Sequence, residues 1–318
     1  MDQPHQAHEG YRHVGYVLRP DDDLTGVVGP VLRRAVAAGE PVVIACAEPL
    51  AGTLLAALGN PGDVRVASPD ALQERPPDAL AAIGRMVDGE LPADGRRLHL
   101  VVGPGQLDDW STWTEVEALL NHVLADRPVD HLCLLGSADA GDRDPDSVVR
   151  ATHPWLLTEE GTVPNPDYRP PAELLREARR RVAPDPLEAT EPDLALIDLD
   201  DMRTLRRALN RVLADTALSP DAAQDLVLAI DEVTANAAEH GVPPVDVKLW
   251  CSPQRVLCAV TDRGTAFDDP LVGYGPAHGD MAVGGMGLWL ARRSVDQLTA
   301  GPADESGAGC TVRLVVNS

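Results

Sequence analysis

One helix with well-marked ends constrains the second half of the chain more than any other feature. It is predicted to begin after Ser219, a serine N-cap followed by proline and an acidic first turn, and to end at Gly241. Apolar residues recur between these points at the spacing of one helix face: Leu226, Ile230, Val233 and Ala237. Glu232 and Asn236 lie one turn apart beside that face. A carboxylate and a carboxamide so placed could hold a magnesium nucleotide.

Two glycine-rich segments follow the helix. Asp262-Arg263-Gly264 comes after the apolar run Val256 to Val260, at the end of a predicted strand. The Asp262 carboxylate could accept a hydrogen bond from the amino group of an adenine. Gly284-Gly285-Met286-Gly287 comes directly before a predicted helix, where glycines let the backbone approach a phosphate. Each feature alone is more often a turn, a loop or a solvated helix edge. Their order and spacing together predict a nucleotide site.

In this order and spacing, the segment from about Leu194 to the C-terminus resembles the Bergerat-fold (GHKL) ATPases, and within them the anti-sigma-factor serine/threonine kinases. The resemblance implies an α+β domain whose sheet is covered by helices on one face, with ATP and Mg²⁺ as cofactors. It implies that Glu232 is the general base and that Asn236 is a ligand of the magnesium ion. The other nucleotide-binding positions that it implies are Asp262, Gly264, Gly285, Gly287 and Thr311.

The first half of the chain alternates short apolar runs with amphipathic stretches. Helices are predicted from Leu24 to Ala38 and from Trp113 to Ala125. The pattern predicts an α/β domain with a mostly parallel sheet, helices on both faces and ligands at the carboxyl ends of the strands. The predicted strands are His13 to Leu18, Pro41 to Cys46, Asp63 to Ala67, Leu98 to Val102 and Val129 to Leu135.

This half is similar to the MEDS sensory domain over about His13 to Leu175. The similarity rests on His13, the passage from Arg33 to Val42, His153-Pro154 and Asn165-Pro166-Asp167-Tyr168. It implies an unknown small-molecule or redox signal, although the segment from Cys133 to Ser137 lacks the tyrosine and aspartate that usually follow in the family.

His131 and Cys133 share one face of a predicted strand, and they could ligate a metal together with His13. Residues of this kind are more often packed core, which is the favoured interpretation.

Prolines between Thr158 and Asp193 predict a semi-rigid connector. The predicted organisation is a polar tail at 1–12, a sensory domain at 13–183, a linker at 184–193 and the ATPase domain at 194–318. Only one helix is expected between about Asp200 and Ser219, which favours the compact anti-sigma kinases.

Composition sets limits on location and partners. A net charge of −23 over 318 residues makes an acidic surface, which argues against direct binding of nucleic acid or of an anionic membrane. Neither a secretory signal nor a membrane-spanning run is visible, and five scattered cysteines argue against a disulfide framework. The expected location is the cytoplasm.

The resemblance therefore predicts a homodimeric signalling regulator that binds a sigma factor in one state and phosphorylates an anti-anti-sigma protein in another. Three alternatives stay open. The protein could sequester a partner without catalysis, with or without ATP, and Met286 between the glycines favours this. It could be an ATPase without a protein substrate. It could also be related to sensor histidine kinases, although only the distant segment His122 to Pro128 faintly resembles a phospho-acceptor box.

Overall fold

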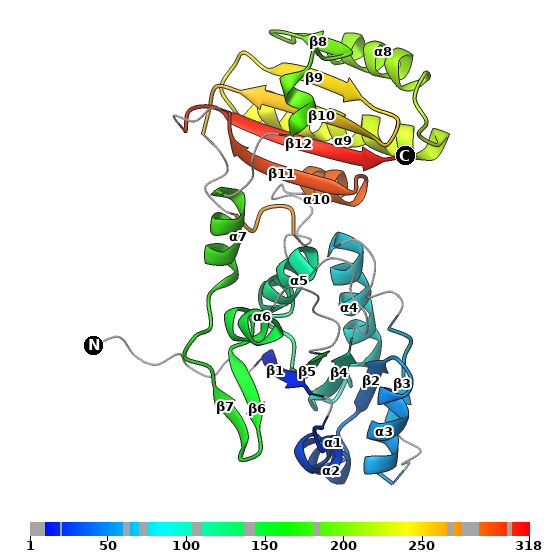
Figure 1. Cartoon of the computed structure of the whole chain (residues 1–318), viewed down its shortest axis with the longest axis vertical. Helices are drawn as coiled ribbons and strands as arrows, with labels where there is room; N and C mark the ends of the chain where they lie inside the picture. The colour runs from blue at the N-terminus through cyan, green and yellow to red at the C-terminus, as the bar shows by residue number, and fades with distance from the viewer. Residues whose placement is uncertain are drawn as a thin grey trace, which may run out of the picture. The chain divides into compact units, whose positions relative to one another are not determined.

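The computed structural model describes residues 10–19, 21–59, 64–69, 76–103, 110–136, 144–180, 185–265, 270–274, 286–303 and 307–318. The chain divides into two compact units, Met1–Leu174 and Leu175–Ser318 (Figure 1). The predicted boundaries at 183 and 193 stay predictions. Within the described ranges, no helix has both the length and the apolar character needed to cross a membrane.

The described strands of the first unit form a seven-stranded sheet in the order β3-β2-β4-β5-β1-β6-β7. All neighbours are parallel except β6 and β7, which confirms the predicted α/β fold with a mostly parallel sheet. The strands are β1 (Arg12–Leu18), β2 (Val42–Cys46), β3 (Val64–Val66), β4 (Leu98–Gly103), β5 (Val129–Gly136), β6 (Trp155–Thr158) and β7 (Gly161–Pro164).

All five predicted strands are present, but the hairpin of β6 and β7 was missed. Its strands have four residues each, and β7 lies in the proline-rich stretch that was interpreted as a connector, with β6 directly before it. Gly161 follows the short turn at a φ of 116°, a conformation that residues with a Cβ rarely adopt. The hairpin adds an edge to the sheet beside β1.

Helices cover both faces of this sheet (Figure 1). The helices are α1 (Leu24–Val27), α2 (Gly29–Ala37), α3 (Leu50–Ala57), α4 (Pro76–Glu90), α5 (Trp110–Val123) and α6 (Pro145–Thr152). Helices α1 to α3 share an apolar core with Val14, Ile44 and Leu132, on the face opposite to α5 and α6. The single helix predicted from Leu24 to Ala38 is two helices, because Pro30 lacks the N–H group needed to continue the first one.

The second unit contains an antiparallel five-stranded sheet in the order β11-β12-β10-β9-β8. Helices α8 (Met202–Leu213), α9 (Pro220–His240) and α10 (Met286–Arg293) pack on one face of it, around Leu205, Ile230 and Leu288. This arrangement confirms the predicted Bergerat-type fold. The strands are β8 (Leu194–Leu196), β9 (Asp246–Cys251), β10 (Arg255–Asp262), β11 (Gln297–Pro302) and β12 (Cys310–Asn317).

Residues 185–193, which we call the strap, lie on the other face of this sheet. They include the 3₁₀ helix η2 (Pro186–Ala189), and Leu187 packs against a small apolar cluster around Trp250. The indole nitrogen of Trp250 donates to the Thr190 carbonyl at 3.0 Å, and Arg313 forms a bidentate ion pair with Glu188 at 2.6 and 3.0 Å. The described part of the predicted linker is therefore bonded to the sheet. Helix α7 (Pro171–Arg180) precedes the strap along the chain.

Candidate functional site

Helix α9 presents the predicted pair of polar residues as its sequence indicates. The Ser219 hydroxyl accepts a hydrogen bond from the Ala222 N–H at 3.1 Å, and the helix ends at His240 with Gly241 as its C-cap. Its apolar face is buried, whereas Glu232 and Asn236 lie half-buried beside it. A carboxylate and a carboxamide therefore stand at the edge of the core, where a ligand can reach them.

Gly287, at the start of α10, lies against both of these side chains. A Cβ atom on Gly287 would overlap the Oε2 atom of Glu232 and would stand 3.7 Å from the Asn236 Nδ2 atom. Only glycine fits there while the carboxylate keeps its position. The first turn of α10, with its unpaired N–H groups, is thus held beside Glu232 and Asn236.

Asp262, at the end of β10, lies in a cradle that backbone N–H groups and two glycines form around its carboxylate. Its Oδ1 atom accepts hydrogen bonds from the N–H groups of Gly264 at 2.6 Å and Val242 at 3.2 Å, and the residue is only 7% exposed. A Cβ atom on Gly241 would lie 2.7 Å from the Asp262 Cγ atom, and one on Gly264 would lie 2.7 Å from Oδ1. The carboxylate therefore joins the end of α9 to the first glycine-rich segment.

Residues 196–316 match a family described as the histidine kinase-like ATPase domain. The second unit carries such a domain. Two solved structures are similar to the chain. The mycobacterial sensor histidine kinase MprB is 21% identical, over 39% of this chain and 96% of that one, with a TM-score of 0.27. The histidine kinase domain of the E. coli osmosensor EnvZ is 17% identical, over 40% of this chain and 90% of that one, with a TM-score of 0.24. No curated protein matches the chain.

The ATPase domain does not bring Thr311 to the cradle of Asp262. Thr311 lies in β12 opposite Thr261, and the two hydroxyl oxygens are 2.9 Å apart on the face of the sheet away from the helices. The β12 residue in register with Asp262 is Cys310, which is buried in the core beneath the helices. The sequence contained this signal, because Cys310 begins the alternating apolar run that continues with Val312.

Gly285 lies outside the described residues, as does most of the segment between Asp268 and Gly284. The described part, 270–274, packs on α10. Gly273 has a φ of 83°, and a Cβ atom there would stand 2.8 Å from the Leu288 Cγ atom. The Arg292 guanidinium lies 3.9 Å from the centre of the Tyr274 ring and donates to the Leu298 carbonyl at 2.9 Å. These contacts fix α10 in the ATPase domain.

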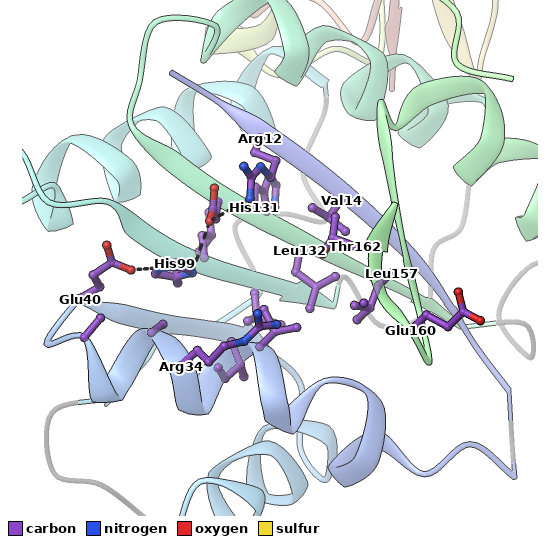
Figure 2. Close-up of a pocket in the computed structure, with 18 residues that line it drawn as sticks. Arg12, Val14, Arg34, Glu40, His99, His131, Leu132, Leu157, Glu160 and Thr162 are labelled. Carbon is purple, nitrogen blue, oxygen red and sulfur yellow. Dashed lines mark hydrogen bonds and ion pairs between the residues drawn. The ribbon is translucent and has the colours of Figure 1, made fainter. Parts of the chain in front are cut away.

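The first unit contains a pocket of 580 Å³ on the α2 side of its sheet (Figure 2). Part of its charged lining comes from the beginnings of the parallel strands, where the His99 Nε2 atom lies 2.6 Å from the Glu40 Oε2 atom, and the rest is Arg34 of α2 and Glu160 of the turn between β6 and β7. Arg12 and Asp130 line the same end. Ligands were predicted at the carboxyl ends of the strands, where the loops 104–109 and 137–143 lie outside the described residues.

On the other face of that sheet, the structure brings His13, His131 and Cys133 together, all of them fully buried. Burial, with the nearby His153 as a second cause, lowers the pKa of His13 to about 4. Burial also raises the pKa of the Cys133 thiol well above its usual value. Two further residues join them, Glu117 from α5 and His153 after α6, and the sequence interpretation did not include these in a site.

Proposed function

We propose that the protein is a cytoplasmic signalling regulator whose ATPase domain binds magnesium ATP and phosphorylates a serine or threonine of a partner protein. The observation that carries this proposal is the contact of Gly287 with Glu232 and Asn236. It places the N-terminus of α10, which favours phosphate, beside a carboxylate and a carboxamide. By the resemblance to anti-sigma kinases, the partners would be a sigma factor and an anti-anti-sigma protein.

Each residue of the site has a part in this chemistry. Asp262 would accept a hydrogen bond from the amino group of the adenine, while its Oδ1 atom keeps the loop in place. Asn236 would hold Mg²⁺, which would neutralise charge on the phosphates when bound. Glu232 would take the proton of the attacking hydroxyl. The new oxygen–phosphorus bond forms at the γ-phosphate as the bond to the β-phosphate breaks, and ADP leaves.

A sensor histidine kinase is the second candidate, because both similar structures carry that description. Such an enzyme needs an acceptor histidine on a helix that leads into the ATPase domain. The sequence has no histidine between His153 and His240, so neither α7, which precedes the matched residues 196–316, nor α8 within them carries one. His122 lies near the end of α5 in the first unit. These positions favour a serine or threonine acceptor.

We propose two further properties of the assembly. The first unit would act as the sensory domain, with the pocket in Figure 2 as its ligand site. The protein would be a homodimer that pairs through β8, an edge strand next to β9 alone, which the exposed Ile197 follows. Light scattering on the full chain tests the second property, and a clean monomer at micromolar concentration would contradict it.

Nucleotide binding is tested first, by thermal unfolding of the full chain with and without magnesium ATP. We expect a rise in the melting temperature that Asn236→Ala and Asp262→Ala abolish, because a ligand that binds only the folded state stabilises it. Asn210→Ala removes an exposed carboxamide of α8 and is the matched control. No rise at millimolar nucleotide would refute the ATPase assignment.

Phosphoryl transfer from radiolabelled ATP then separates the candidate functions. An acid-stable, base-labile product on a partner supports a serine or threonine kinase. An acid-labile product supports a histidine kinase. Release of phosphate without transfer supports an ATPase that has no protein substrate. Partner binding with neither reaction supports the sequestering protein.

A further inference from the structure

Four side chains of metal-ligating types converge on the face of the first sheet that α5 and α6 cover. They are His13 of β1, Glu117 of α5, Cys133 of β5 and His153, which follows α6, and none of them is exposed. Their ligand atoms all lie within 4.8 Å of one another. Two strands, one helix and the segment after α6 thus contribute one side chain each to a single buried group.

The distances within the group fit tetrahedral coordination. The Glu117 Oε2 atom lies 3.1 Å from His13 Nε2, 3.3 Å from His153 Nε2 and 3.4 Å from Cys133 Sγ. The His13 Nε2 atom lies 3.2 Å from Cys133 Sγ. With zinc bonds of about 2.0–2.3 Å, ligand atoms at the corners of a tetrahedron are separated by about 3.3–3.8 Å. In these four pairs, shifts of a few tenths of an ångström would complete the geometry, and the remaining pairs lie within 4.8 Å.

The hydrogen bonds around His153 orient its free nitrogen into the group. Thr152 donates its only hydroxyl proton to the Val148 carbonyl at 2.8 Å, so that hydroxyl must accept from His153 Nδ1 at 2.9 Å. The proton of a neutral His153 ring is therefore on Nδ1, and Nε2 directs a lone pair toward Glu117. Histidines that bind metals commonly donate their other ring N–H in this way.

Unsatisfied polar atoms are concentrated in the same place. Among the described residues, the buried side-chain atoms without a hydrogen-bond partner include His13 Nδ1, Glu117 Oε1 and His153 Nε2. Native proteins leave few such atoms, because an unpaired buried polar group is costly. A divalent ion would use the His153 lone pair and would neutralise two negative charges, the Glu117 carboxylate and a Cys133 thiolate.

Gly15 makes the room that the group needs. It pairs with Cys133 across β1 and β5, and a Cβ atom there would stand 2.8 Å from the His153 Cγ atom and 2.6 Å from the Val149 Cγ1 atom. Any other residue would push the imidazole of His153 away from the sheet.

A second layer supports the thiol. The Tyr11 hydroxyl lies 2.6 Å from His131 Nδ1, and His131 Nε2 lies 3.4 Å from Cys133 Sγ. When Tyr11 donates to His131, the opposite nitrogen carries the proton and donates to the sulfur, as is usual around metal-bound ligands.

We propose that His13, Glu117, Cys133 and His153 bind one divalent transition-metal ion of the zinc class. The two imidazoles, one thiolate and one carboxylate form a donor set that suits zinc, and four protein ligands close the coordination sphere. The bound ion joins β1, β5, α5 and the segment after α6 at the centre of the first unit.

Cobalt titration of the metal-free full chain tests this site. We expect uptake of one Co²⁺ per chain, with the d–d bands of a tetrahedral site and a thiolate-to-cobalt charge-transfer band, all reversed by Zn²⁺. Cys133→Ser should remove the charge-transfer band, and His153→Gln should weaken binding by more than the roughly 10–100-fold that loss of a partner behind a metal ligand already causes. Cys46→Ser, at another buried cysteine of the same sheet, should change neither. A folded chain that takes up no cobalt, or a band that survives in Cys133→Ser, would overturn the proposal.

X-ray absorption at the zinc edge of the wild-type full chain avoids any variant that fails to fold. One sulfur and three nitrogen or oxygen neighbours are expected. A first shell without sulfur, or with more than one sulfur, would place the ion elsewhere and refute the assignment.

Discussion

The two units each place a carboxylate in a group of polar side chains that packs against a glycine, but they do so by different means. In the ATPase domain, Glu232 and Asn236 come from a single helix and stay half-buried, facing Gly287. In the first unit, Glu117 is fully buried, and its partners come from β1, β5 and the segment after α6. The first arrangement leaves both side chains partly exposed, within reach of a ligand that enters and leaves. The second can enclose only an ion, which would become part of the fold.

The largest expected effect contrasts the two carboxylates. Glu232→Ala should lower phosphoryl transfer by about 10²–10⁴-fold, the usual contribution of a general base, while ATP affinity and stability change little. Glu117→Ala should instead lower the free energy of unfolding by about 3–5 kcal/mol, because it removes the partner of buried groups. Transfer assays and urea unfolding measure the two effects, with the exposed Glu239→Ala as the control. Equal effects of both variants on stability would remove the distinction.

The next effect tests whether the strap belongs to the fold of the second unit. A fragment of residues 175–318 keeps the strap, whereas one of residues 194–318 loses Glu188 and the acceptor of Trp250 and leaves Arg313 without its ion pair. We expect the shorter fragment to be less stable by about 2–4 kcal/mol, from lost apolar cover and a broken, half-buried ion pair. Urea unfolding of both fragments decides this. Matching midpoints would mean that the strap is only a connector.

Two glycine variants compare the closed group with the open site. Gly15→Ala should lower the free energy of unfolding by about 1–3 kcal/mol, because the added methyl overlaps His153 and Val149. Gly287→Ala should mainly weaken ATP binding, because the half-buried Glu232 can move away from the new methyl group, which then stands where a phosphate would approach the first turn of α10. Thermal unfolding and nucleotide titration of both variants give the comparison. A large loss of stability in Gly287→Ala would show that the two glycines have the same role.

The smallest expected effect separates two neighbours in β12. Cys310→Val should weaken ATP binding by roughly tenfold or less, the effect of one added methyl group near a bound base. Thr311→Val should leave ATP binding unchanged and lower stability by about 1 kcal/mol, because it removes the hydrogen bond with Thr261 on the opposite face. Nucleotide titration of the two variants is sufficient. A weaker affinity in Thr311→Val alone would restore Thr311 to the site.

These contrasts explain how much the sequence could predict. Features with a short, regular spacing were predicted well: the ends of α9, the pair of Glu232 and Asn236, and the five strands of the first sheet. Local hydrogen bonds and periodic burial determine such features, and both are visible in a few consecutive residues. The resemblance to the Bergerat-fold ATPases, and not a local spacing, predicted that the second sheet has helices on one face.

Features that depend on pairing between distant segments were missed. Glu117 lies in a helix whose other polar residues, where they are described, are only partly buried, so nothing local indicates that it is fully buried against His13 and His153. The hairpin of β6 and β7 was hidden by its prolines, and the strap was interpreted as a linker for the same reason. Thr311 is different, because the alternation of β12 was visible and only the family pattern suggested otherwise.

The Asp262 side chain loses its conformational entropy when the chain folds, before any ligand binds. Two backbone N–H groups and two glycines already hold its carboxylate in the folded chain. A rotamer that folding has fixed does not have to be fixed again when a base arrives. In the proposed complex, association with nucleotide would therefore keep free energy that a mobile acidic side chain would have lost, and the rigidity of this one residue would become affinity.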